Sequence, residues 1–329
     1  MRKVPVIDIH AHFYPEPYLR LLAEEGERLG VRLRRQSRGG LVFEMRDGVL
    51  GPIQPAFTDL DLRLKEMNRQ RVDVHALSLT RPMVYWAEGS LGLKLAQATN
   101  DAIAEAHQAF PDRFVGFATL PMQEPDLALQ ELDRAARLPG IRGVYLGTNV
   151  NGRDLSHADF LPLFQRIEEL RLPVFLHPLH VIGRERLKPY FLYNLLGFPF
   201  DTAVAAVFSG LLDRFPGLTA CLPHAGGSFP YLVGRMNRGH KIHPDCKQIE
   251  HRPSTYLRRF TYDTISHDPL ALLYLIRLVG PDRVMLGSDF CFEIGYDRPV
   301  QVVTRLAPLS SSDQRRILGG NASRLLGLG

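Results

Sequence analysis

The stretch VPVIDIHAHFYPEPY (residues 4–18) gives the first indication of how this chain folds. Its first half is short, apolar and rich in β-forming residues, as expected of a strand that is buried on both faces. The run ends with His10 and His12, which lie at positions i and i+2 and therefore share one face of that strand. Taken alone, the pair is equally compatible with a metal site and with ordinary buried histidines.

Short apolar runs of this kind recur along the chain. They cover residues 4–10, 72–80, 114–121, 141–147, 172–178, 218–224, 260–264 and 283–289. Stretches with helical spacing of apolar residues lie between them, at 59–70, 89–110, 125–138, 157–170, 201–214, 268–279, 310–320 and 321–328. Alternation of strand and helix repeated in this way predicts an α/β fold, a parallel (β/α)8 TIM barrel.

The first connection of the predicted barrel is too long for one helix. Residues 30–57 contain turn signals at Gly39-Gly40 and Asp47-Gly48 between apolar runs, which predict a small antiparallel β insertion over the barrel mouth. The 329 residues, 45% hydrophobic and 23% charged, have an ordinary globular composition. We therefore expect a single barrel domain over residues 1–329, with the insertion at about 30–57.

Cysteine content and charge restrict the cellular setting and the partners. The chain has three cysteines, an odd number that argues against a disulfide scaffold and favours a reducing, cytoplasmic setting. No apolar stretch is long enough for a membrane span, and Asp8 with the two histidines interrupts the N-terminal apolar run, so no signal peptide is expected. The net charge of +5 suits a small anionic substrate. The basic run 28–38 lacks interleaved aromatic residues, so no nucleic-acid partner is expected.

Five polar side chains fall at the carboxyl ends of the predicted strands. His10 and His12 end the first strand, His177 the fifth, His224 the sixth and Asp289 the eighth. Barrel enzymes build their active sites at this end, so we expect the five side chains to meet there. Three imidazoles and a carboxylate suit a divalent transition metal, with zinc the first choice. Each residue alone has a structural explanation, such as helix capping by Asp289, but their joint placement predicts a metal site.

Four motifs resemble the amidohydrolase superfamily. They are DIHAHFYP (8–15), FLHP (175–178), LPHAGGSFPYLVGRM (222–236) and DRVMLGSDF (282–290), and GGNASRLL (319–326) follows near the end of the chain. More narrowly, the chain resembles the branch around aminocarboxymuconate-semialdehyde decarboxylase and related hydroxybenzoate decarboxylases. This resemblance covers nearly the whole chain and implies a barrel enzyme that depends on a metal ion.

The resemblance also implies roles for individual residues. The metal ligands would be His10, His12, His177 and Asp289, and the acid/base that activates the metal-bound water would be His224. Arg235 would reach a substrate carboxylate, commonly in the site of the partner subunit, which implies a homodimer. The fourth strand contains no lysine that could bridge two metals, so one Zn²⁺ per chain is expected.

Two segments depart from the pattern of this branch. Gly51 stands near the place where the aminocarboxymuconate enzyme has an arginine that binds the substrate carboxylate, and the nearest arginine is Arg46. After Asp289, the sequence FCFEIG (290–295) replaces a stretch that usually contains proline, and it places Cys291 near the metal. We expect Cys291 to be a small buried hydrophobic residue rather than a catalytic thiol. These departures bear on the identity of the substrate more than on the class of reaction.

The predicted function is metal-dependent, nonoxidative decarboxylation of a small unsaturated or aromatic carboxylate. His224 and Asp289 are the predicted catalytic residues, and Arg235, Arg81 and Arg184 are candidates for a charge-assisted fork to a substrate carboxylate. Arg81 and Arg184 are equally compatible with surface ion pairs. The same site could hydrolyse a lactone or amide, or hydrate a double bond, because metal hydroxide attacks all these electrophiles. A noncatalytic metal-binding barrel is a weaker alternative, since it would have no use for His224.

Overall fold

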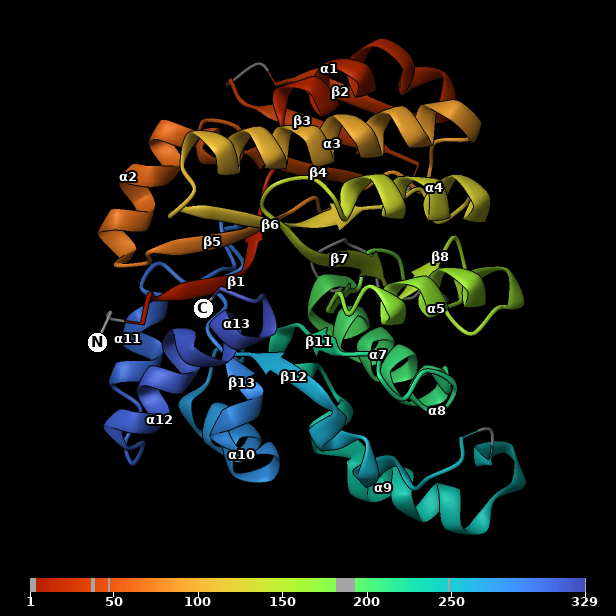
Figure 1. Ribbon diagram of the computed structural model, residues 1–329, viewed down its shortest axis with the longest axis vertical. Helices are drawn as coiled ribbons and strands as arrows, with labels where there is room; N and C mark the ends of the chain where they lie inside the picture. Colours follow the sequence, from red (N-terminus) through yellow and green to blue (C-terminus); the bar gives the residue numbers. More distant parts are fainter. Residues whose placement is uncertain (1–3, 37–38, 47, 182–192, 248, 329) are drawn as a thin grey trace.

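Eight parallel strands form a nearly closed barrel with helices around it (Figure 1). The structure is a computed structural model that describes residues 4–36, 39–46, 48–181, 193–247 and 249–328. Neighbouring strands follow the order of the chain. They are β1 (Ile7–His12), β5 (Val74–Ser78), β6 (Phe114–Thr119), β7 (Ile141–Gly147), β10 (Val174–His177), β11 (Ala220–Leu222), β12 (Phe260–Asp263) and β13 (Val284–Met285). The predicted (β/α)8 barrel is therefore confirmed, and each strand lies within one of the eight predicted runs or extends it by two residues.

The first and last strands meet through backbone hydrogen bonds that close the barrel. The amide of Ile9 donates to the carbonyl oxygen of Leu286 (2.9 Å), and the amide of Asp289 donates to that of His10 (3.0 Å). The amide of His12 donates to the carbonyl of Phe290 (2.6 Å). These contacts place the segment after β13 directly beside the carboxyl end of β1.

The helices cover the outside of the barrel, and most of them begin where the sequence predicts. They are α2 (Leu60–Gln70), α3 (Gly89–Ala109), α4 (Pro125–Ala135), α5 (Leu161–Glu169), α7 (Phe198–Ala203), α8 (Leu211–Arg214), α10 (Pro269–Val279), α12 (Ser311–Arg315) and α13 (Asn321–Leu325). The carboxylate of Asp59 accepts a hydrogen bond from the amide of Leu62 (2.9 Å) and caps α2. The helix therefore begins at the start of the predicted stretch 59–70.

Three further helices and one division depart from the predicted pattern. The additional helices are α1 (Glu16–Glu25), α9 (Phe229–Ile242) and α11 (Pro299–Thr304). The single helix predicted over 201–214 is divided into α7, a π-helical segment at Val204–Phe208, and α8. Gly210, with φ of 65°, separates the last two because this left-handed backbone cannot continue a right-handed helix.

The predicted insertion is a separate three-stranded antiparallel sheet made of β2 (Val31–Arg35), β3 (Leu41–Met45) and β4 (Gly48–Ile53). Its inner face carries Phe43, whose ring lies 5.1 Å from that of Tyr14, just after β1. Leu50 of β4 is also buried in this cluster. These apolar contacts hold the insertion over the carboxyl end of the barrel.

Alternate residues of β1 face opposite sides of the barrel wall. All six residues of the strand are buried, and the ring of His10 lies 5.0 Å from that of Phe175 of β10 inside the barrel. His10 and His12 project from the same face, as predicted, with their Nε2 atoms 3.0 Å apart.

None of the helices in the described ranges combines the length and the apolar character that a membrane span requires.

Candidate metal centre

Five side chains from four strand ends converge at the carboxyl end of the barrel. Asp289 Oδ1 lies 3.1 Å from Nε2 of His12 and 3.4 Å from Nε2 of His10. The ring of His177, at the end of β10, lies 5.0 Å from that of His10 and also 5.0 Å from that of His224, which follows β11. Potential ligand atoms of His10, His177, His224 and Asp289 all lie within 4.8 Å of one another. The structure therefore brings together all five residues that were predicted from their positions at strand ends.

The three predicted histidine ligands are oriented from behind through their Nδ1 atoms. His10 Nδ1 lies 2.7 Å from Asp263 Oδ2, and His12 Nδ1 lies 3.2 Å from Ser78 Oγ. His177 Nδ1 lies 2.9 Å from the carbonyl oxygen of the next residue. The carboxylate of Asp263 and the carbonyl oxygen beside His177 only accept hydrogen bonds, so in the neutral imidazoles of His10 and His177 the proton lies on Nδ1 and Nε2 directs a lone pair towards the common centre. The hydroxyl of Ser78 can donate or accept, so it does not by itself impose a tautomer on His12.

The protonation states of these groups fit a divalent cation. Burial lowers the pKa of His12 to about 4, against the opposing effect of Asp289, so this imidazole is neutral near pH 7. Burial also lowers the pKa of His177, whose buried Nε2 has no hydrogen-bond partner among the described residues. Burial raises the pKa of Asp289, but the contact with His12 and the electrostatic effect of His10 outweigh it and lower the pKa to about 2. The neutral imidazoles of His12 and His177 and the ionised carboxylate of Asp289 are the forms that bind metal ions. For His10, the hydrogen bond to Asp263 and the charge of Asp289 outweigh burial and raise the pKa.

His224 occupies a strained turn at the edge of this cluster. It begins a short 3₁₀ turn (His224–Gly226) with φ of 52°, and Asp289 has φ of 62°. Left-handed backbone at non-glycine residues is uncommon and concentrates at functional sites. His224 Nε2 lies 4.0 Å from Asp289 Oδ2. Burial is the main cause that lowers the pKa of His224, so its imidazole is neutral and can accept a proton.

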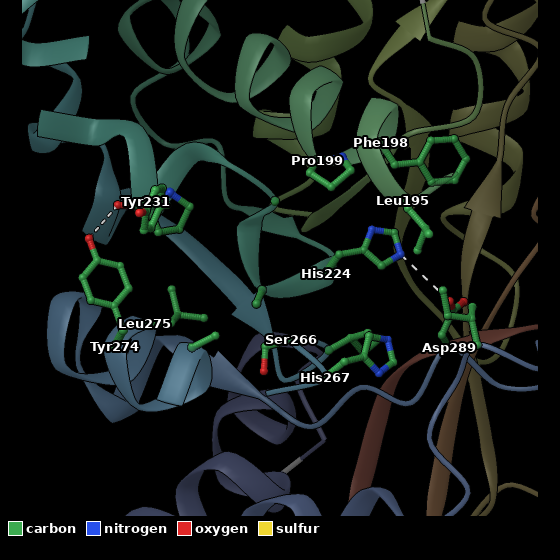
Figure 2. A pocket seen from close by; sticks show the side chains of 16 residues that line it. Leu195, Phe198, Pro199, His224, Tyr231, Ser266, His267, Tyr274, Leu275 and Asp289 are labelled. Atoms are coloured by element: carbon green, nitrogen blue, oxygen red, sulfur yellow. Dashed lines mark hydrogen bonds and ion pairs between the residues drawn. The ribbon is translucent and has the colours of Figure 1, made fainter. Parts of the chain in front are cut away.

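Two hollows meet at His224 and Asp289. The larger hollow, of about 420 Å³, has mainly apolar walls from the helices that follow β10, β11 and β12 (Figure 2). Its apolar lining includes Leu195, Phe198, Pro199, Ile265, Tyr274 and Leu275. The smaller hollow, of about 200 Å³, lies under the insertion and is lined by Gln54, Thr80, Arg81 and His177 among others. An organic substrate therefore has space on either side of the predicted metal ligands.

The predicted substrate arginines differ in their placement. Arg81 follows β5, is buried and lines the smaller hollow. Arg235 is exposed on α9 and is not among the residues that line either hollow. Arg184 lies outside the residues that the structure describes. Only Arg81 can therefore be placed beside the predicted metal site of its own chain.

The two departures from the branch pattern both lie at the smaller hollow. Gly51 and Cys291 line it, whereas Arg46 lines a different cavity on the other side of Arg81. Burial raises the pKa of Cys291 to about 12, so its side chain is a thiol at neutral pH. This protonation state agrees with the expectation that Cys291 is not a catalytic thiolate, but the residue is half-buried and not fully buried as expected.

Two residues at this site were not among the sequence predictions. Asp263, the partner of His10, ends β12, and His267 lies on the loop that follows and lines the larger hollow (Figure 2). The signal that identified His177 was its place at a strand end, and it applied equally to Asp263. His267 lies beyond the strand end, so this signal did not apply to it.

Comparison with known proteins places the chain in a family. The model of the family described as amidohydrolase matches residues 7–328. A 2-amino-3-carboxymuconate-6-semialdehyde decarboxylase of Dictyostelium discoideum is 35% identical, covering 98% of this chain and 91% of the relative. A gamma-resorcylate decarboxylase of Rhodococcus jostii is 30% identical, covering 71% of this chain and 77% of the relative. The crystal structure of a 5-carboxyvanillate decarboxylase from Sphingomonas paucimobilis matches with a TM-score of 0.83 and 28% identity, covering 98% of this chain and 99% of that one. The chain therefore belongs to the amidohydrolase family, and its relatives named here are decarboxylases.

Proposed function

We propose that this protein is a metal-dependent, nonoxidative decarboxylase of a small aromatic or unsaturated carboxylate. The observation that carries the proposal is the cluster of His10, His177, His224 and Asp289 at the junction of two hollows. His12 joins this cluster through its contacts with His10 and Asp289. The relatives support the class of reaction, because proteins similar over most of this chain are named as decarboxylases. Their printed substrates differ, so the proposal names a substrate class and no single compound.

In this proposal His10, His12, His177 and Asp289 hold one divalent ion. Three imidazoles and a carboxylate are common ligands of zinc, which is therefore the proposed ion, and Mn²⁺ is the alternative to be tested. When bound, such an ion would stabilise developing negative charge and lower the pKa of a coordinated water. One ion is proposed because β7 contains no lysine that could bridge a second ion. Tyr145 of the same strand instead stacks against His177, with ring centroids 5.5 Å apart.

The proton transfer in the proposed reaction belongs to His224. Its neutral imidazole would accept a proton at Nε2 from water and pass it to the substrate carbon that bears the carboxylate. Asp289 Oδ2, 4.0 Å away, would stabilise the imidazolium. Once the substrate carbon has four single bonds, its bond to the carboxylate breaks, the electron pair returns to the ring or enoate, and carbon dioxide leaves. The reaction consumes one proton for each carbon dioxide released and needs no oxidant.

The group proposed to bind the substrate carboxylate is the guanidinium of Arg81. Arg81 is 6% exposed and lines the smaller hollow together with His177 and Asp289. A guanidinium can form two parallel hydrogen bonds to a carboxylate, which would fix the orientation of the substrate against the metal centre. Arg184 remains a second proposed candidate for this role.

We also propose that the working unit is a cytoplasmic homodimer. Arg235 lies on a helix that extends away from the barrel (Figure 1). The same helix carries exposed Tyr231, and α10 adds exposed Tyr274, so two large rings line the larger hollow and are open to solvent. Apolar patches of this kind mark protein interfaces, and an interface here would allow Arg235 to approach the hollow of a partner. The three unpaired cysteines agree with a reducing compartment.

The test is a substrate screen with metal-loaded enzyme. Dihydroxybenzoates, aminocarboxymuconate semialdehyde and a panel of lactones and amides would be assayed in parallel, with carbon dioxide and hydrolysis products measured separately. The proposal expects release of carbon dioxide from at least one carboxylate without any added oxidant. Hydrolysis of lactones or amides with no carbon dioxide from the carboxylates would instead assign the chain to the hydrolases.

A further inference from the structure

We infer that Asp263 is a positioning residue that fixes the tautomer of His10 and links it to the two loops flanking the larger hollow. The inference deepens the proposed function and rests on it, because it assumes that His10 binds the metal ion. It concerns a carboxylate that neither binds the ion directly in this scheme nor lines a hollow. Its consequences can be measured as metal affinity and as a proton position, independently of any substrate.

Both oxygens of Asp263 are committed to specific partners. The residue is fully buried at the end of β12, and its Oδ2 lies 2.7 Å from Nδ1 of His10. Its Oδ1 accepts hydrogen bonds from the amides of Ala225 (2.9 Å) and Ile265 (3.0 Å). Ala225 directly follows His224, and both Ala225 and Ile265 line the larger hollow. One carboxylate therefore joins a predicted metal ligand to the loops after β11 and β12.

This arrangement decides which nitrogen of His10 carries the proton. Two backbone N–H groups point at Oδ1, which must act as an acceptor, so Oδ2 is the atom left to face the imidazole. A carboxylate oxygen accepts the Nδ1 proton of His10, and Nε2 then keeps a free lone pair. That Nε2 lies 3.0 Å from Nε2 of His12 and 3.4 Å from Asp289 Oδ1, where a shared cation would sit.

The Nδ1 atoms of the other two histidines contact a hydroxyl and a backbone carbonyl, not a carboxylate. Ser78 Oγ, 3.2 Å from Nδ1 of His12, is a hydroxyl that can donate or accept, so it does not impose a tautomer by itself. His177 is held by a backbone carbonyl, which no side-chain substitution removes. Among these three contacts, the Asp263–His10 pair is the shortest and the one with a carboxylate, so its effect on the metal site should be the largest.

Replacing Asp263 by asparagine reverses this contact without a large change of shape. The amide oxygen of Asp263→Asn would keep the hydrogen bonds from Ala225 and Ile265, because those backbone N–H groups need an acceptor. Its NH₂ group would then face His10 Nδ1, which must become the acceptor, and the imidazole proton moves to Nε2. The lone pair that binds the metal is thereby removed. Loss of such an outer partner typically weakens metal affinity by about 10- to 100-fold, and we expect a change of this size.

A matched substitution controls for the general cost of altering a buried aspartate. Asp201 on α7 is 6% exposed and accepts hydrogen bonds from the side chains of Thr148 and Asn149, with no hydrogen bond or ion pair to the predicted metal ligands among the described residues. Asp201→Asn should leave the dissociation constant for Zn²⁺ unchanged. The smaller effect expected for Ser78→Ala on metal affinity provides a graded comparison at the same site.

The experiment combines two measurements on full-length protein. The Zn²⁺ dissociation constant of each variant is obtained by competition with a chromophoric chelator, and nitrogen NMR of metal-free wild type reports the His10 tautomer without relying on a variant that has to fold. We expect an Nδ1–H tautomer in wild type and weaker binding in Asp263→Asn. An Nε2–H tautomer in wild type, or wild-type affinity in a folded Asp263→Asn protein, would overturn the role of Asp263. Failure of wild type itself to bind a divalent metal would overturn the proposed metal centre instead.

Discussion

His12 Nε2 lies 3.1 Å from Asp289 Oδ1, although the two residues come from the first and last strands of the barrel. The contact is reinforced by backbone hydrogen bonds from His12 to the carbonyl of Phe290 (2.6 Å) and from Asp289 to that of His10 (3.0 Å). The hydrogen bonds that close the barrel are therefore the same ones that bring together three of the proposed metal ligands. A substitution that disrupts these closing hydrogen bonds should therefore lower metal affinity.

Asp289→Asn should weaken metal binding and abolish activity. An amide is a poorer ligand than the carboxylate, and it also removes the negative charge that compensates the cation. Elemental analysis of purified wild type should give about one divalent ion per chain, since four protein ligands are available and β7 offers no bridging lysine. Two ions per active chain would contradict a mononuclear site.

His224→Ala should keep the metal but lose on the order of 10²–10⁴ in kcat, the usual contribution of a general acid/base. The structure makes this a sharp test, because the ligand atoms of His224 also lie within 4.8 Å of those of His10, His177 and Asp289. Metal content and activity should be measured on the same preparation. A metal-free His224→Ala protein would show that His224 is a ligand and that its proposed role is wrong.

Aminocarboxymuconate semialdehyde should be a poor substrate, because Gly51 lines the smaller hollow where an arginine is expected. Gly51→Arg should not restore the missing contact. The backbone at Gly51 has φ of +131°, and a Cβ atom there would lie 3.0 Å from Val42 and 3.1 Å from the carbonyl of Leu41. The measurement is kcat/KM for this compound against a dihydroxybenzoate. Efficient turnover of the semialdehyde would mean that another arginine, such as Arg81, supplies the contact.

Mixing two inactive variants tests the proposed dimer. The helix that carries Arg235 begins at Phe229, so Arg235 lies about 9 Å along it at a rise of ~1.5 Å per residue. It is exposed and would act on the site of the partner. His224→Ala and Arg235→Ala chains should each be nearly inactive.

Co-refolded mixtures of the two variants should recover roughly a quarter of wild-type activity. With random pairing, half of the dimers are mixed, and each mixed dimer has one complete site of two. Recovery requires that neither substitution prevents association, which is checked by measuring the molar mass of the mixture. Inactivity of a mixture that contains heterodimers would place Arg235 outside the chemistry or in the site of its own chain.

Stability should depend on pH through Asp201. Burial raises the pKa of this carboxyl above its ordinary value of 3.8, against the hydrogen bonds from Thr148 and Asn149. The folded state therefore binds the proton more tightly than the unfolded state. This contribution to the free energy of unfolding is fully present below the unfolded pKa and is lost as the pH rises through the raised folded pKa. Asp201→Asn should flatten that part of the pH profile in urea unfolding, and an unchanged profile would contradict the assignment.

Local sequence patterns determined the eight strands and the polar residues at their carboxyl ends. Alternation along the strand places His10 and His12 on one face of β1. His177, His224 and Asp289 were predicted as site residues because each lies at the carboxyl end of a predicted strand. These predictions succeeded because a parallel barrel brings all its strand ends to one face, whatever the details of packing. The break in the predicted helix at 201–214 was missed, because its apolar spacing continues through Gly210.

Only the tertiary structure decided how these residues are held and what surrounds them. The contact between His10 and Asp263 joins residues 253 positions apart, and its geometry depends on the register of two strands on the barrel. The division of the space around His224 into two hollows depends on where the insertion and the helices after β10, β11 and β12 come to rest. The outward exposure of Arg235 follows from the direction of α9, which its own sequence does not specify. Local periodicity fixes which face of an element a residue occupies, whereas distances between elements are set by packing of the whole chain.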